Sequence, residues 1–156
     1  MPNVGEPFKE CEIEIAPYVC KLTGKISATV YESGGQGPTG IIRVNQPWYV
    51  KVNWELEGPL LHHLCGKFCI ALHIECMGSG PEETLATVYV PMDPCGDGKY
   101  ESYINVAAGV IDEAACGQVC CLYITLTSLD ECGDPGHIAA YCEGPCIMFA
   151  PAPDND

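Results

Sequence analysis

Residues 48–56 show the most regular alternation of apolar and polar side chains in the chain. Successive side chains of a β-strand point to opposite faces of the sheet, so a period of two predicts a strand with one apolar face. The apolar positions carry aromatic, β-branched or leucine side chains: Trp48, Val50, Val52, Trp54 and Leu56. The positions between them are Tyr49, Lys51, Asn53 and Glu55. We therefore expect a half-buried central strand here.

A second alternating run covers residues 68–76, after a short loop. Its apolar face carries Phe68, Ile70, Leu72, Ile74 and Cys76. Two neighbouring strands with one apolar face each are typical of an antiparallel sheet packed on a core. The loop between the two runs contains His62, His63 and Cys65, so the strongest fold signal borders the residues best suited to chemistry.

Shorter runs of the same kind recur along the rest of the chain. They lie at 10–15, 25–32, 84–90, 100–106, 119–127, 138–142 and 146–150, and segments rich in Gly and Pro separate them. Roughly seven to nine short strands without an amphipathic helix predict an all-β protein, an antiparallel β-sandwich of immunoglobulin-like or jelly-roll topology. A closed barrel is an alternative that strand number does not exclude. We expect residues 1–16 to be an N-terminal strand or arm, 17–150 the sandwich domain, and 151–156 a flexible acidic tail.

Four short motifs extend the sandwich prediction by resemblance. They are NQPWYV at 45–50, CGKFC at 65–69, DPCGDGKY at 93–100 and AAG at 107–109. In this combination the chain resembles a group of small bacterial, chiefly cyanobacterial, β-rich proteins that have no assigned activity. The resemblance covers most of residues 18–128 and implies one intact domain.

The charge balance narrows the classes of partner. The chain has seven Lys and Arg against 21 Asp and Glu, a formal net charge of −14. Nucleic acid and anionic membrane surfaces need clustered basic residues, so neither is expected as a partner. No apolar run approaches the roughly 20 residues that span a bilayer as a helix. An acidic surface favours solubility and attracts divalent cations.

Cysteine content is the other unusual property of the chain. An even number of cysteines at this density predicts a disulfide-reinforced fold, although the pairing cannot be deduced. The disulfide candidates are Cys11, Cys20, Cys65, Cys69, Cys76, Cys95, Cys116, Cys120, Cys121, Cys132, Cys142 and Cys146.

Spacing restricts some of these pairs. Two residues four apart on a straight strand lie about 13 Å apart, beyond the ~7 Å that a disulfide tolerates between Cα atoms. A Cys65–Cys69 or Cys142–Cys146 bond therefore needs a turn, and the alternative is that each cysteine reaches a neighbouring strand or loop. Adjacent Cys120 and Cys121 face opposite sides of a strand, so we expect one to be a core residue and the other to be available for a lateral bond.

The sequence gives conflicting indications of the cellular compartment of the protein. Dense cysteines favour an extracellular or cell-surface location. Residues 1–7 have neither the basic nor the apolar region of a signal peptide. Four explanations would reconcile these observations. A leader could have been removed from this sequence, export could use another route, oxidation could follow lysis or assembly, or many thiols could stay reduced.

A metal site is one possible use of the loop before residue 68. Thiolate and imidazole are preferred zinc ligands, and a site could be completed by Cys116 or Cys120. The candidate zinc ligands are His62, His63, Cys65 and Cys69. Their spacing departs from ordinary zinc modules, so exposed loop histidines beside a disulfide are the simpler interpretation. Calcium at the acidic loops 93–97 and 130–134 is a weaker alternative to ordinary turns.

No catalytic motif emerges from the sequence. A Cys69–His73 dyad is conceivable, but nothing marks an oxyanion hole or an orienting group, so we expect no enzyme. We expect a non-enzymatic structural or interaction protein, which self-associates or binds another protein and could assemble into a cross-linked fibre or surface layer. Arm 1–16 could complete its own sheet or add to the edge of another subunit. The alternative is a zinc-binding or thiol-dependent module that uses the loop from His62 to Cys69.

Overall fold

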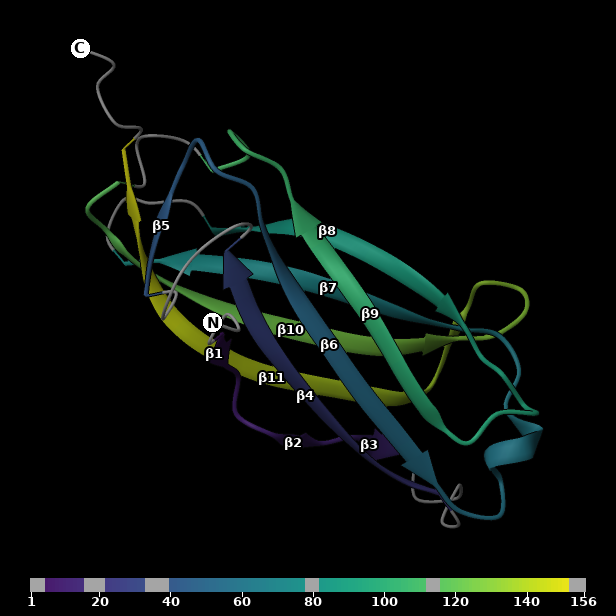
Figure 1. The fold of residues 1–156 in the computed structure, drawn as a ribbon. Helices are drawn as coiled ribbons and strands as arrows, with labels where there is room; N and C mark the ends of the chain where they lie inside the picture. The colour runs from purple at the N-terminus through teal and green to yellow at the C-terminus, as the bar shows by residue number, and fades with distance from the viewer. Residues whose placement is uncertain (1–4, 16–21, 33–39, 78–81, 112–115, 152–156) are drawn as a thin grey trace.

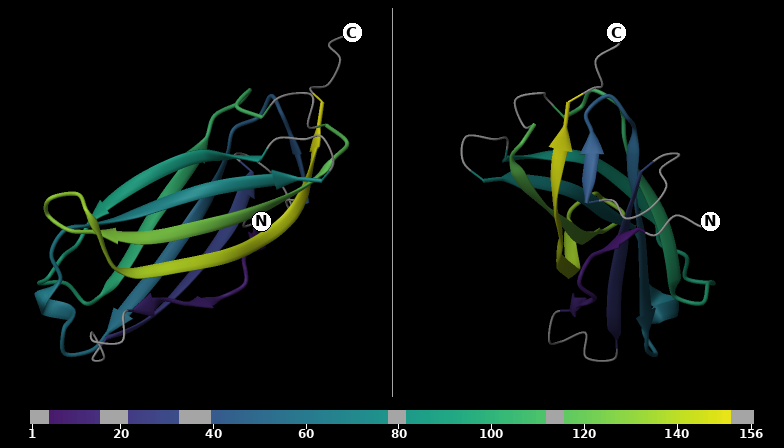
Figure 2. Two further views of the ribbon diagram at one scale, coloured as in Figure 1. Left: turned by 180° about the vertical axis from the view of Figure 1, so that it is seen from behind. Right: turned by 60° about the vertical axis from the view of Figure 1, so that its left-hand side comes forward.

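The computed structural model describes residues 5–15, 22–32, 40–77, 82–111 and 116–151. These residues form two β-sheets that pack face to face, as the views in Figure 1 and Figure 2 show. The predicted all-β sandwich, reinforced by disulfides, is confirmed. In the described part of the chain the only helical element is the short 3-10 turn η1 (Leu61–His63).

The first sheet, sheet A, has five strands. They are β1 (Glu6–Pro7), β2 (Cys11–Glu12), β4 (Thr23–Glu32), β6 (Trp48–Glu57) and β9 (Lys99–Val106). Their order is β1-β4-β6-β9, and β2 also pairs with β4. All of these pairs are antiparallel.

The second sheet, sheet B, has six strands. They are β3 (Glu14–Ile15), β5 (Ile41–Arg43), β7 (Lys67–Cys76), β8 (Glu82–Pro91), β10 (Val119–Leu129) and β11 (Pro135–Ala150). Their order is β3-β11-β10-β7-β8, and β5 pairs with the end of β11 in parallel. The connections from β6 to β7 and from β8 to β9 cross between the sheets, which makes the two layers one unit.

The alternation at residues 48–56 and 68–76 predicts both inward faces correctly. Trp48, Val50, Val52, Trp54 and Leu56 of β6 are buried, as are Phe68, Ile70, Leu72, Ile74 and Cys76 of β7. Trp54 stacks on Tyr100 at 5.5 Å between ring centroids and meets the edge of Phe68. The core therefore lies between β6 and β7, and both tryptophans are core residues.

The N-terminal arm accounts for the larger number of strands than we expected. In place of a single strand, residues 5–15 form three two-residue strands, β1 and β2 on sheet A and β3 on sheet B. The Phe8 amide donates to the Ala28 carbonyl of sheet A at 2.8 Å, and the Lys9 amide donates to the Glu143 carbonyl of sheet B at 3.1 Å. The arm thus lies along β4 and β11 of its own chain and joins the two sheets there (Figure 1).

Candidate functional site

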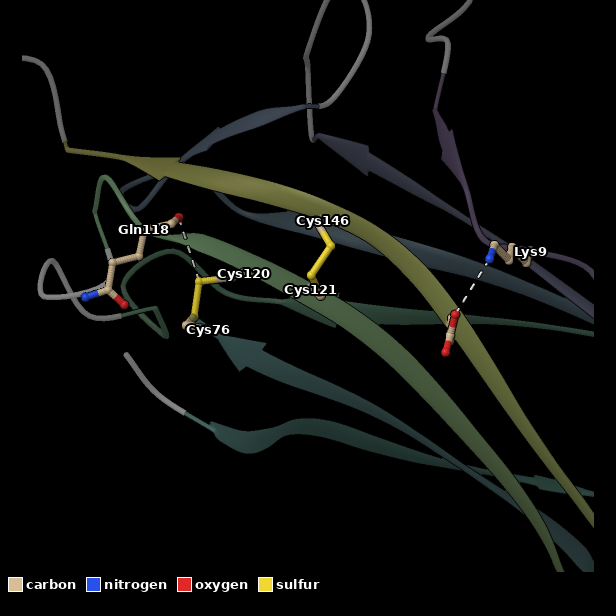
Figure 3. The surroundings of a disulfide bond; sticks show 7 residues. Lys9, Cys76, Gln118, Cys120, Cys121 and Cys146 are labelled. Carbon is tan, nitrogen blue, oxygen red and sulfur yellow. Dashed lines mark hydrogen bonds and ion pairs between the residues drawn. A yellow bond between two sulfur atoms is a disulfide. The ribbon is translucent and has the colours of Figure 1, made fainter. Parts of the chain in front are cut away.

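Two disulfides join the central strand β10 to both of its neighbours. Cys76 of β7 bonds to Cys120, and Cys146 of β11 bonds to Cys121, each with Cα atoms 3.9 Å apart (Figure 3). In both pairs the two residues lie directly opposite each other in the strand register. The Met77 amide donates to the Val119 carbonyl at 2.9 Å, which makes Cys76 and Cys120 a close pair without mutual hydrogen bonds. We call the end of sheet B that holds these bonds the stapled end.

The adjacent cysteines have different surroundings because their side chains point to opposite faces. Cys120 is fully buried in the core, whereas Cys121 is half-buried on the outer face of sheet B. The expectation of one core residue and one cysteine available for a lateral bond is met by Cys120 and Cys121 respectively, and the core residue Cys120 forms a lateral bond as well. Cys146 reaches the neighbouring strand, so it does not pair with Cys142.

Three exposed cysteines lie at the other end of the sandwich. Cys65 precedes the first residue of β7, Cys95 lies between β8 and β9, and Cys132 lies between β10 and β11. Figure 1 shows these three connections together at the end opposite to the start of β10. We call this region, formed by residues 58–66, 92–98 and 130–134, the loop-thiol end.

Backbone and side-chain hydrogen bonds hold these loops against one another. His62 Nδ1 donates to the Pro94 carbonyl at 2.7 Å, and the Met92 amide donates to the Gly66 carbonyl at 2.9 Å. A hollow of about 460 Å³ lies between the loops, and Cys65 is part of its wall. The wall also includes sequence neighbours of Cys95 and Cys132, namely Pro94, Glu131 and Gly133.

The acidic loops form ordinary turns. Asp93 Oδ1 accepts a hydrogen bond from the Cys95 amide at 3.0 Å, and Asp130 Oδ1 accepts from the Cys132 and Asp134 amides at 2.9 Å each. These side-chain bonds to the backbone are the usual way in which aspartate stabilises a turn. They also fix the backbone on which Cys95 and Cys132 are displayed.

The proposed zinc ligands do not converge. His62 and His63 belong to η1, Cys65 follows them in the loop, and Cys69 is a half-buried residue of β7 that lies opposite Tyr89 and Thr127. Within the described ranges, no three His, Cys, Asp or Glu side chains form a group that could hold a metal ion.

His73 does not assist Cys69. Its Nδ1 and Nε2 atoms are each 2.8 Å from a threonine hydroxyl, that of Thr84 and that of Thr125 respectively. The ring also stacks on Tyr123 at 4.7 Å between centroids. Partial burial lowers the pKa of His73, which favours the neutral imidazole ring.

Four further cysteines lie outside both the disulfides and the loop-thiol end. Cys116 is half-buried where its backbone forms a bridge with Phe149. Cys20 lies outside the described residues. Cys11 and Cys142 come together beside Lys9, because both thiols donate to its carbonyl oxygen. Sequence spacing gives no signal for that contact, since it depends on how the arm crosses from one sheet to the other.

No protein-family model matches this chain, and no curated protein matches it significantly. Within the described residues, no helix has the length and apolarity needed to cross a bilayer.

Proposed function

We propose that the protein is a non-enzymatic structural subunit whose copies become cross-linked through disulfides at the loop-thiol end. The observation that supports this proposal most directly is the exposure of Cys65, Cys95 and Cys132 on three neighbouring loops. Three is an odd number, so no pairing among these cysteines alone uses all of them. A thiol left over in such a group is suited to a bond with a second molecule.

The placement of the intrachain disulfides supports the same division of roles. Along β7, Cys65 lies just before the first residue and Cys76 is the last residue. The Cys76–Cys120 bond and the neighbouring Cys121–Cys146 bond therefore stabilise the end opposite to the exposed thiols. A subunit of this kind has one internally reinforced end and one end available for assembly.

Cross-linking requires an oxidant. Two thiols, one from each copy, lose two hydrogen atoms and two electrons to dioxygen or to a small disulfide, and one S–S bond forms. This requirement is consistent with an oxidising location such as the cell surface. The resemblance to small cyanobacterial β-rich proteins, which have no assigned activity, stays a separate hypothesis. No contact in the described residues favours the alternative of a zinc-binding module.

The proposal is tested with the full chain and a triple variant, Cys65→Ser with Cys95→Ser and Cys132→Ser. After incubation with oxidised glutathione, we expect the natural protein to form covalent oligomers on a non-reducing gel and ordered assemblies by negative-stain microscopy. Reductant should disperse both. The triple variant should remain monomeric by size-exclusion chromatography with light scattering.

A matched control separates the loop cysteines from other thiols. Cys11→Ser with Cys142→Ser also removes cysteines that lie outside the two disulfides, but none at the loop-thiol end. This variant should oligomerise as the natural protein does. Monomers of the natural protein at high concentration under oxidising conditions, or equal oligomerisation of the triple variant, would exclude the proposal.

A further inference from the structure

Cys11 and Cys142 are held at one point by two different sheets. Cys11 belongs to β2 and lies opposite Ile26 of sheet A. Cys142 belongs to β11 and lies opposite Ile124 of sheet B. The Lys9 carbonyl oxygen lies 3.3 Å from Cys11 Sγ and 3.0 Å from Cys142 Sγ, so both thiols converge on the same acceptor.

The neighbouring contacts of the arm fix this meeting point. The Lys9 amide donates to the Glu143 carbonyl at 3.1 Å, and Lys9 Nζ lies 3.8 Å from Glu143 Oε2. Figure 3 shows Lys9 beside β11, away from both disulfides. Backbone pairing on both sheets sets where each cysteine lies along its strand, so both thiols approach the Lys9 carbonyl without any change of the fold.

The two thiols differ in their access to solvent. Cys142 is fully buried, whereas Cys11 is half-buried and open to solvent in part. Burial, and then a hydrogen bond with the Cys11 side chain that favours the neutral form, raise the pKa of Cys142 to about 12. Cys142 therefore stays protonated at neutral pH, and Cys11 is the thiol that a reagent in solution meets first.

We propose that Cys11 and Cys142 form a third disulfide, a latch that ties the N-terminal arm to β11. The known bonds connect neighbouring strands inside sheet B. The latch instead connects a strand of sheet A to a strand of sheet B. It forms within one chain, because both sulfur atoms lie within hydrogen-bond distance of the same Lys9 carbonyl oxygen.

A small disulfide such as oxidised glutathione supplies the oxidising equivalents. The Cys11 thiolate attacks one sulfur of the reagent, and the first glutathione leaves and takes up a proton. Cys142 then gives up its proton and attacks the Cys11 sulfur, and the second glutathione leaves. Two protein thiols and one small disulfide thus become one protein disulfide and two small thiols.

The latch is tested on the full chain by mapping its disulfides. The protein is purified without reductant, incubated with oxidised glutathione, alkylated, digested and analysed by mass spectrometry. We expect a linked peptide pair that contains Cys11 and Cys142, recovered from the monomer band of a non-reducing gel. Alkylation of both residues after this treatment would overturn the proposal, as would a Cys11–Cys142 link found only in covalent dimers.

A second measurement follows the arm itself. Amide hydrogen exchange in residues 5–15 should slow at least tenfold on oxidation, because the arm can no longer leave β11 without opening the sandwich. Cys11→Ser keeps the buried Cys142 and should show no such slowing, whereas Cys69→Ser should behave as the natural protein does. Equal slowing in Cys11→Ser would show that the effect does not come from this bond and would overturn the latch.

The melting temperature gives an independent readout. A bond that closes most of the chain into one loop is expected to raise the melting temperature by roughly 10 °C for a domain of this size. The loop-thiol variant, with Cys65, Cys95 and Cys132 replaced by Ser, should show the same rise. Failure of the latch therefore leaves the cross-linking proposal standing, and failure of cross-linking leaves the latch.

Discussion

Cys142 shows how one buried thiol couples stability to pH. Its pKa in the folded protein is raised to about 12, because of burial and the Cys11 contact, from an ordinary value of 9.0. The unfolded chain therefore loses this proton at lower pH than the folded protein does. The contribution of the neutral thiol to stability is complete below about pH 9 and is lost as the pH rises from about 9 to about 12.

This difference predicts a specific pH dependence for the protein with Cys11 and Cys142 reduced. The free energy of unfolding should fall between pH 9 and pH 11 more steeply than it does for Cys142→Ala, because the variant lacks this titration. Urea denaturation at several pH values measures both slopes. Parallel curves for the two proteins would contradict the assigned origin of the shift.

Adding a side chain at Gly144 should cause a steric clash where the N-terminal arm contacts β11. A Cβ atom added to Gly144 would overlap the ring of Phe8, which is buried. We expect Gly144→Ala to destabilise the protein by about 1–3 kcal/mol, because the arm must move to relieve the clash. Gly40→Ala is the matched control, since a Cβ there would have no neighbour within 4 Å.

Hydrogen exchange localises this effect. In Gly144→Ala, residues 5–15 should exchange faster while β7 and β10 keep their protection. In Gly40→Ala the arm should exchange as in the natural protein. Unchanged exchange of the arm in Gly144→Ala would mean that Phe8 does not anchor it.

Among the strands, β10 contributes one cysteine to each of the two disulfides. Removal of Cys76–Cys120 or of Cys121–Cys146, by paired substitutions to Ala, should lower the free energy of unfolding by roughly 3–4 kcal/mol in each case. The sequence separations of 44 and 25 residues predict only a small difference from loop closure.

Burial makes the first removal the more costly one. Cys76 and Cys120 are both buried, so their replacement also leaves unfilled space in the core, whereas Cys121 is half-buried at the surface of the sheet. Urea unfolding without reductant compares the two variants directly. A larger loss for the Cys121–Cys146 variant would contradict this ranking.

The elements also differ in how far their residues predict them. The alternation in β6 and β7 predicts both the strand and its buried face. Successive side chains of a strand point to opposite faces, so a period of two places all the apolar residues on one face. The crossing of the arm was not predictable, since β1, β2 and β3 are too short to carry a period.

The pairing of the cysteines could not be predicted from the sequence for a related reason. Whether Cys120 lies opposite Cys76 depends on which strands are neighbours and on their register, and neither is written in the spacing of cysteines. The meeting of Cys11 with Cys142 depends in addition on the path between two sheets.

For the whole molecule, the net charge of −14 opposes association of identical copies. If copies join at the loop-thiol end, oxidative cross-linking should be several-fold faster at 0.5 M than at 0.01 M salt, because the Debye length falls from about 30 Å to a few ångströms. Initial rates of dimer formation on non-reducing gels measure this effect. A rate that does not depend on salt would argue against contact between these acidic ends.

The two bonds on β10 have a mechanical consequence. If copies are cross-linked through Cys65 or Cys132, tension on a copy should first separate strands β7, β10 and β11 at the loop-thiol end. The separation should stop at Cys76–Cys120 and Cys121–Cys146, because covalent bonds withstand more force than the hydrogen bonds elsewhere in sheet B. Under a pulling force, the sheet should therefore lengthen by a fixed amount, after which the two disulfides should resist further extension.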